Sequence, residues 1–480
     1  MGASKEKLIW LIILFGLALR VISLDQSLWL DEAINTLAVK NYSFFDLITQ
    51  YARADFHPPG WFIILWFWTR VFGYSEIAVR VPSVIFGILT VYITYLIGRK
   101  LVSIHLGLIS ALLLAINPLH IYYSQEARMY ALATLAVAMN ILLFIKILKG
   151  ERLHLILLIL SNIFVLASDY IAYFIFPAQL IFLIILQKRE VLKRWGMAFI
   201  LAIASGIWWL PTFLGQLDVG SVASANLPAW KFIVGGFDFK TLPLTFVKFI
   251  IGRISLADKI IYAAVLLPVC SLFIFLLFRA VKYLDNFNRK LLIIWVIVPL
   301  LIATVISTFI PVYNYFRVLF VLPSFVILIA SGLLSFKGKV RYVFLIIVVL
   351  IEFFCSFIYL LNPVFQREDW KGVVSFLNKE QQSIILFESS GTLPSFDYYA
   401  QNNLNAKGAL KDFPAKDESA VSGLENLLED TKDIYLVDYL VQISDPNRLV
   451  AKKLVNLGYE QVDVKNFSGV GFVYHYIKDE

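Results

Sequence analysis

A series of apolar segments, each about 17 to 25 residues long, fills most of the first 361 residues and constrains the fold more than any other feature. A helix of that length matches the roughly 30 Å thickness of the hydrocarbon region of a membrane. Of the 480 residues, 60% are hydrophobic and only 16% are charged, whereas a soluble protein of this size would carry more charge. The sequence therefore predicts a polytopic α-helical membrane protein.

About eleven segments are long and apolar enough to be counted as spans. The region 153–186 fits either two short spans or one long helix. The predicted spans cover residues 8–24, 79–97, 103–119, 129–147, 153–168, 170–186, 195–214, 259–279, 290–310, 316–335 and 341–361.

Lysine and arginine residues gather in short clusters between these segments, and with eleven spans all the clusters fall on one side of the membrane. The positive-inside rule makes that side cytoplasmic and places the N-terminus there. The net charge of +8 comes from these topological clusters, so it does not predict nucleic-acid binding. The clusters are Lys5/Lys7, Arg99/Lys100, Lys146/Lys149/Arg152, Lys188/Arg189/Lys193/Arg194, Arg279/Lys282/Arg289/Lys290 and Lys337/Lys339/Arg341.

The first outer loop, residues 25–78, is expected to be structured. Its apolar run from Trp61 to Val71 is too short to cross the membrane, and a crossing there would place the basic clusters on opposite sides. We therefore predict an interfacial or re-entrant helix at this run, and two short helices that begin near Asp31 and Phe44. The outer loop 215–258 contains several glycines and prolines and is expected to be mostly irregular, apart from one amphipathic turn at Leu244–Ile251.

After Asn362 the composition changes from lipid-like to soluble. Helix-like and β-rich stretches alternate from there to the end of the chain. We therefore divide the chain into a transmembrane domain, residues 1–361, and a small soluble α/β domain, residues 362–480, on the outer face. Its length is sufficient for a modest core.

Polar side chains in three of the predicted outer loops lie within a few residues of span ends. Carboxylates and arginines at a water-restricted boundary suit a transfer reaction, in which a base takes a proton from an acceptor and cations hold a phosphate leaving group. The candidate site residues are Asp31, Glu32, Asp55, His57, Glu126, Arg128, Tyr130, Tyr315 and Arg317.

Several of these residues also have a purely structural interpretation. Asp31 and Glu32 could only complement the dipole of a surface helix whose first turn they occupy. His57, which precedes two prolines, could be a turn residue solvated at the interface. The tryptophan beside the acidic pair and its position at the outer boundary favour a functional role for the pair.

The arginines have structural alternatives as well. Glu126 and Arg128 could form a topological anchor pair, and Arg317 could extend from a span end toward water. For Arg20, which interrupts the first span, this extension toward water is our preferred interpretation, and a contact with donor phosphate is the alternative.

The motifs that carry these residues resemble the dolichyl-phosphate-mannose protein mannosyltransferase family and its prokaryotic relatives. The resemblance covers about the first 130 residues well and residues 310–370 loosely. Gly60 departs from it, because a leucine-like residue is expected after the two prolines. The matching stretches are Leu28-Trp29-Leu30-Asp31-Glu32-Ala33, Asp55-Phe56-His57-Pro58-Pro59-Gly60, residues 117–132, Tyr315-Phe316-Arg317-Val318 with Pro323, and Gln366-Arg367-Glu368-Asp369-Trp370.

This resemblance implies the C-type glycosyltransferase membrane fold and a donor whose isoprenoid phosphate is held at the outer boundary. It implies that Asp31 is the general base on the acceptor hydroxyl and that Glu32 positions the acceptor or the donor sugar. For Arg128 and Arg317 we infer phosphate contacts, since a guanidinium pairs two oxygens at once. The other predicted donor-binding residues are His57, Tyr130 and Tyr315, and Asp55 and Glu126 complete the site.

The sequence thus predicts an inverting glycosyltransferase that moves a monosaccharide from a polyprenyl-phosphate donor to an acceptor hydroxyl, with protein Ser or Thr as one acceptor class. An enzyme that modifies a lipid or glycan, resembling the aminoarabinose transferases, is the alternative. A transporter or flippase of lipid-linked sugars would place its charges at mid-membrane, so it is the weaker alternative. No cofactor is expected to be required, and two adjacent carboxylates alone are a poor cage for a divalent metal ion.

Overall fold

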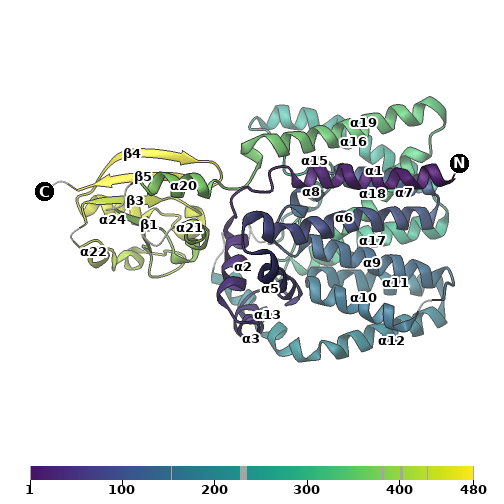
Figure 1. Ribbon diagram of the computed structural model, residues 1–480, viewed down its shortest axis with the longest axis horizontal. Coiled ribbons are helices and arrows are strands. Elements are labelled where there is room, and N and C mark those ends of the chain that lie inside the picture. Colours follow the sequence, from purple (N-terminus) through teal and green to yellow (C-terminus); the bar gives the residue numbers. More distant parts are fainter. Residues whose placement is uncertain are drawn as a thin grey trace. The chain divides into compact units, whose positions relative to one another are not determined.

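The computed structural model describes residues 2–152, 154–226, 235–379, 383–400, 404–429 and 431–478. The chain forms two compact units. Figure 1 shows the chain coloured along its sequence. Unit 1 is built from residues within Met1–Leu24, Tyr42–Ala223 and Phe232–Leu361. Unit 2 is built mainly from Asp25–Asn41 and Asn362–Glu480, so the segment that carries the acidic pair groups with the C-terminal residues.

All regular structure in the described part of unit 1 is helical, and a helix lies in each of the predicted spans. The longer helices are α1 (Gly2–Val21), α6 (Glu76–Leu101), α7 (Ile104–Ile116), α9 (Tyr130–Leu148), α10 (Leu155–Ser168), α11 (Ile175–Leu186), α12 (Arg189–Ser205), α13 (Leu210–Asn226), α16 (Lys259–Tyr283), α17 (Asn286–Ile306), α18 (Leu322–Leu334) and α19 (Gly338–Leu361).

Five of the helices in the described ranges are long and apolar enough to cross a membrane, or up to seven if each of two bent pairs counts as one span. The protein is therefore an integral membrane protein, while the number of eleven crossings stays a prediction. One bent pair is α7 with α8 (Pro118–Ser124), which meet at an angle of 64°. Pro118 disfavours a helical conformation at Asn117, whose side chain instead caps α8 by accepting from the backbone N–H of His120.

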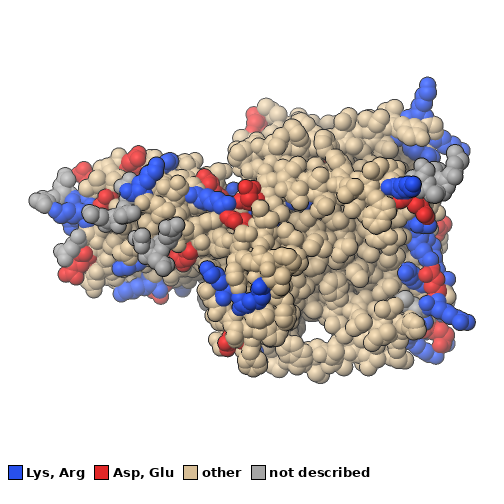
Figure 2. Space-filling view, in the orientation of Figure 1, with Lys and Arg blue, Asp and Glu red and all other residues tan. Residues whose placement is uncertain are grey.

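The predicted basic clusters come together at one end of unit 1, which we call the basic end. In Figure 2 Lys and Arg gather at this end, and the sides of the helical unit that are in view show few charged residues. The contacts that join the clusters are Arg99 with Glu6 (2.9 Å), Lys100 with Glu151, Lys188 with the Leu148 carbonyl (2.7 Å), Asn288 with the Leu101 carbonyl (3.1 Å) and Arg279 with Ser335 (3.0 Å).

Short helices occupy the region 25–78, as predicted. The second predicted helix is a run of three short pieces, α3 (Phe44–Asp46), the π-helical η1 (Leu47–Tyr51) and α4 (Ala52–Ala54). The run after the two prolines is α5 (Gly60–Phe72), and α15 (Thr241–Ile251) covers the predicted amphipathic turn.

The expectation of irregular structure from residue 215 onward is wrong for its first part, because α13 continues to Asn226. Two glycines in this helix each cost only about 1 kcal/mol of helix propensity. Tertiary contacts outweigh that cost. Gln216 on α13 is buried, and its side chain donates to the carbonyl of Ala52 at 2.9 Å.

A five-stranded sheet forms the centre of unit 2, with strand order β2-β1-β3-β5-β4. Strand β1 pairs in parallel with β2 and β3, whereas β5 pairs antiparallel with β3 and β4. The strands are β1 (Ile384–Phe387), β2 (Asn405–Gly408), β3 (Asp433–Val437), β4 (Glu460–Phe467) and β5 (Gly471–Ile477). The sequence pattern predicts β-rich stretches at 383–387, 433–437 and 469–477, so it missed β2 and β4.

Buried side chains cover both faces of this sheet because residues alternate along each strand. Phe387 and Val437 belong to one core cluster, whereas their neighbours Leu386 and Leu436 belong to the other. Helices α20 (Trp370–Leu377) and α21 (Pro394–Tyr399) contribute to the first cluster, and α22 (Leu424–Leu427) and α24 (Leu449–Asn456) contribute to the second. The C-terminal residues thus form an α/β unit, whose position at the outer face stays a prediction.

The grouping of the basic clusters generates a topology test. A reporter inserted in the loop 188–194 should be cytoplasmic, and a reporter fused after residue 480 should be outside, because an odd number of crossings separates the two positions. Protease protection or cysteine labelling in intact cells would measure both positions. Two reporters on the same side would contradict the eleven-span topology.

Candidate active site

Asp55 and His57 form a close pair in the turn between α4 and α5. The Nδ1 atom of His57 lies 2.5 Å from Oδ1 of Asp55, and both side chains are largely buried. Burial by itself would raise the pKa of Asp55, but the charge and hydrogen bond of His57, followed by the charge of Arg128, hold this pKa below its usual value. The pair is therefore an ionised carboxylate that orients an imidazole.

Gly60, the residue that departs from the family pattern, begins α5 directly after this turn. A Cβ atom at this position would lie 2.2 Å from the backbone carbonyl oxygen of Ala167. Only glycine permits this close approach of the two backbones. Gly60 thus departs from the family pattern at a position where close backbone packing fixes the start of α5.

The loop between α8 and α9 carries Glu126, Arg128 and, at the start of α9, Tyr130. Their exposed fractions are only 2%, 6% and 5%. A topological anchor pair would reach headgroups and water, so this burial argues against that interpretation of Glu126 and Arg128. The Arg128 guanidinium carbon lies 6.0 Å from the centre of the Tyr130 ring, and the Arg128 charge acts on Asp55.

Aromatic contacts join this loop to the segment that precedes α18. Phe316 packs against Tyr130 and Tyr123, with ring centres 5.2 and 5.6 Å apart. Tyr315 packs edge-on against Phe316 at 5.4 Å. The next residue, Arg317, is partly buried, and its buried Nε atom has no hydrogen-bond partner in the described part of the chain.

Of the seven candidate residues of unit 1, five are linked by the Asp55–His57 ion pair, by the charge of Arg128 on Asp55, and by ring contacts from Arg128 to Tyr130 and through Phe316 to Tyr315. The other two, Glu126 and Arg317, lie within two residues of these in the chain. All seven belong to the end of unit 1 opposite the basic end, because α9 separates Tyr130 from Lys146 and its 19 residues span about 28 Å. The seven are Asp55, His57, Glu126, Arg128, Tyr130, Tyr315 and Arg317.

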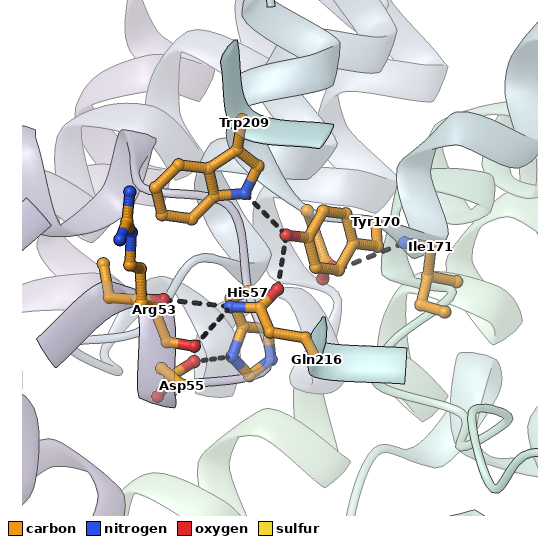
Figure 3. A network of polar contacts seen from close by, with 9 residues as sticks. Arg53, Asp55, His57, Tyr170, Ile171, Trp209 and Gln216 are labelled. Carbon is orange, nitrogen blue, oxygen red and sulfur yellow. Dashed lines mark hydrogen bonds and ion pairs between the residues drawn. The ribbon is translucent and has the colours of Figure 1, made fainter. Parts of the chain in front are cut away.

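A cleft of about 480 Å³ adjoins the Asp55–His57 turn, between residues 53–56 and 211–219. Figure 3 shows the polar network beside it, in which Tyr170 donates to Gln216 (2.6 Å) and accepts from Trp209 (2.8 Å). The volume is within the usual range for small-molecule sites.

Asp31 and Glu32 belong to unit 2, in the first turn of α2 (Leu30–Asn41). Glu32 is completely buried, and its carboxylate accepts from the backbone N–H of Trp29 at 3.5 Å. Asp31 is partly exposed. The structural alternative for the pair also fits this first-turn position, since both charges complement the helix dipole.

Arg253 makes a contact that the sequence analysis did not predict. Arg253 lies over the ring of Tyr122, 4.5 Å from its centre, and bonds to the Tyr122 hydroxyl. The preceding Gly252 has φ +67°, and its close approach to Pro118 brings α15 against α8. The sequence signal that could have indicated this contact was a glycine and an arginine directly after an amphipathic helix.

The preferred interpretation of Arg20 is wrong. Its guanidinium does not reach water, because the residue is 0% exposed and its nitrogens bond to side chains and carbonyls within unit 1. The partners are the carbonyls of Gly16 (2.8 Å), Ala115 (2.8 Å) and Leu114 (3.3 Å), Ser124 Oγ (3.2 Å) and His120 Nδ1 (2.7 Å).

Among the described ranges of the chain, no three histidine, cysteine or acidic side chains gather into a metal-ligand set. The expectation that the reaction requires no cofactor or divalent ion stays a prediction.

The Asp55–His57 pair generates a stability prediction. Asp55→Asn should lower the free energy of unfolding by about 1–3 kcal/mol at pH 7, because it removes the charge that pairs with His57 and Arg128. Since the Asp55 pKa is lowered in the fold, the difference from wild type should shrink as the pH falls below about 4. Thermal unfolding in detergent would measure this difference in stability. Glu190→Gln, a change at an exposed residue, is the control. Equal melting temperatures at pH 7 would contradict the pairing.

Comparisons with known proteins agree with this architecture. Residues 56–209 match the family model described as dolichyl-phosphate-mannose-protein mannosyltransferase. An uncharacterized protein of Aquifex aeolicus (strain VF5) is 26% identical over 197 residues, which cover 40% of this chain and 39% of that protein.

Solved structures show the fold. ArnT from Cupriavidus metallidurans in the apo state matches with a TM-score of 0.59 and 11% identity, over 99% of this chain and 98% of that chain. The oligosaccharyltransferase AglB from Archaeoglobus fulgidus matches with a TM-score of 0.55 and 13% identity, over 98% of this chain and 74% of that chain. Residues 56–209 are therefore similar to the protein mannosyltransferase family, and the chain shares its fold with the solved structures of ArnT and AglB.

Proposed function

We propose that this protein is an inverting glycosyltransferase that moves a monosaccharide from a polyprenyl-phosphate donor to an acceptor hydroxyl at the outer membrane face. The observation that carries the proposal is the gathering, in unit 1, of buried polar groups around Asp55, His57 and Arg128, beside the segment that holds Arg317. The buried Nε atom of Arg317, which has no hydrogen-bond partner among the described residues, costs free energy that an anionic ligand would recover.

Arginine is suited to the phosphate of such a donor. Its planar fork contacts two phosphate oxygens at once, and a partly buried setting strengthens the attraction. We assign Arg128 and Arg317 to the donor phosphate, with His57, Tyr130 and Tyr315 around the phosphate or the sugar. Asp55 orients His57, and Glu126 completes the polar lining.

In the proposed reaction, Asp31 takes the proton from the acceptor hydroxyl. The acceptor oxygen attacks the anomeric carbon in line with the bond to phosphate, so a new C–O bond forms as the bond to the phosphate oxygen breaks. The configuration at the anomeric carbon inverts, and polyprenyl phosphate leaves with its charge held by the arginines. Glu32, the neighbour of Asp31 in the first turn of α2, positions the acceptor or the donor sugar.

Similar proteins support a lipid-linked donor. The structure of ArnT bound to undecaprenyl phosphate matches this chain with a TM-score of 0.56 and 10% identity, and that of AglB contains a dolichol-phosphate. For this chain we propose protein Ser or Thr as the acceptor. Lipid or glycan acceptors are the alternative, and mass spectrometry of products from a panel of donors and acceptors would separate them. Movement of donor across the membrane without product would indicate a flippase.

One prediction of this proposal concerns the base, Asp31. Asp31→Asn should abolish sugar transfer while the protein stays folded, because an amide cannot accept the acceptor proton. Asp25→Asn, an exposed carboxylate six residues earlier in the chain, is the matched control and should keep full activity. Product formation from a polyprenyl-phosphate sugar would be measured. Near-normal turnover by Asp31→Asn would remove Asp31 from the base role.

The second prediction concerns the donor phosphate. Arg317→Lys should raise KM for the donor by about 10- to 100-fold, because lysine keeps the charge but loses the two-oxygen contact. Arg189→Lys, an exposed arginine at the basic end, should leave KM unchanged. A change confined to KM for the acceptor would contradict the phosphate assignment.

A further inference from the structure

The motif Gln366-Arg367-Glu368-Asp369-Trp370 has no role in the proposed reaction so far, although it opens the C-terminal part of unit 2. Within unit 2 it is hydrogen-bonded to the segment that carries Asp31. The bonds are from the Arg367 N–H to Gln26 (2.8 Å), from the Lys371 N–H to Ser27 (3.2 Å) and from Lys371 Nζ to the Asp25 carbonyl (2.7 Å).

Two further contacts hold the same segment at the start of α2. The Leu28 N–H donates to the Tyr399 hydroxyl at 2.8 Å, and Leu30 packs against the core cluster that contains Trp370 and Tyr439. Asp31 directly follows Leu30. The C-terminal part of unit 2 therefore fixes the backbone on which Asp31 stands.

Glu368 is the carboxyl group that this motif places in electrostatic contact with Asp31. Its oxygens accept from Trp370 Nε1 at 2.7 Å and from the Tyr439 hydroxyl at 2.9 and 3.0 Å. Gly469 packs against it so closely that a Cβ atom there would lie 3.0 Å from the Glu368 Cα atom. Burial, followed by the charges of Glu368 and Asp31, raises the pKa of Tyr439, so its hydroxyl stays a proton donor to Glu368.

We propose that Glu368 is a positioning residue for the reaction, whose negative charge opposes the charge on Asp31 and so favours transfer of the acceptor proton to Asp31. The proposal rests on the base role of Asp31 described above. Protonation of Asp31 relieves the repulsion between the two carboxylates, so the ionised form of Glu368 accelerates the step that produces it. The C-terminal α/β part then contributes a residue to the reaction.

The ionisation of Glu368 falls in the neutral range. Burial and the charge of Asp31 raise the pKa of Glu368 to about 7, while the bonds from Trp370 and Tyr439 and the charge of Arg367 act in the opposite direction. Glu368 is therefore mostly neutral at pH 6 and mostly ionised at pH 8. Because its charge favours proton transfer, kcat should rise as the pH passes through about 7.

The test is the pH profile of kcat in full-length protein. Glu368→Gln should lower kcat about tenfold at pH 8 and leave it nearly unchanged at pH 6, since the charge is lost but the shape is kept. Glu368→Asp, which keeps the charge, should restore the rise with pH. Tyr439→Phe should shift the rise to higher pH, because it removes a bond that stabilises the ionised form. Glu418→Gln, an exposed acidic residue of unit 2, should match wild type.

The proposal would be overturned if the pH profile of kcat for Glu368→Gln rose in parallel with that of wild type. If Asp31→Asn is inactive in the same series, the proposed function stands and only the role of Glu368 fails. If wild type transfers no sugar from any donor in the panel, the proposed function fails instead.

A second measurement does not depend on activity. Like-charge repulsion predicts that Asp31→Asn and Glu368→Gln each raise the melting temperature at pH 8, and that the double variant gains less than the sum, because one repulsion is removed only once. At pH 5, where Glu368 is neutral, this non-additivity should vanish. Additive shifts at pH 8 would show that the two carboxylates are not coupled and would overturn the proposal.

Discussion

The completely buried guanidinium of Arg20 holds together the helices on which the candidate site of unit 1 rests. A buried charge is strongly unfavourable unless each of its donors is paired. The partners of Arg20 come from α1, α7 and α8 and include Ser124 and His120. These helices cannot separate without leaving the charge unpaired, so the arginine fixes the bend between α7 and α8.

The loop that follows α8 takes its position from this arrangement. The amide of Gln125 donates to the carbonyls of Arg20 and Ile22, and its oxygen accepts from the Tyr359 hydroxyl on α19. Glu126 and Arg128 come directly after this anchored residue. Their side chains are therefore buried at a fixed place, where rigid donors lose little entropy on contact with a phosphate.

Contacts within unit 2 hold the acidic pair in place in a similar way. Asp31 lies on a short helix, and an isolated helix of 12 residues is marginally stable in water. The residues before it bond to the start of the C-terminal part, which also supplies Glu368. The α/β part thus provides α2 with the packing and hydrogen bonds that a free loop would lack, and it gives a physical reason for a second folded part in a membrane protein.

Hydropathy and charge are local properties of the chain, so the sequence alone was enough to predict the helical segments, the short helix after the two prolines, the basic clusters and the candidate residues. Burial and pairing depend on residues far apart in the chain, and only the tertiary structure decided them. It placed Arg20 inside the protein, extended α13 through Gly220, and bonded the segment before Asp31 to Arg367 and Lys371, more than 300 residues away. A local pattern cannot contain such long-range partners, because they are chosen by packing.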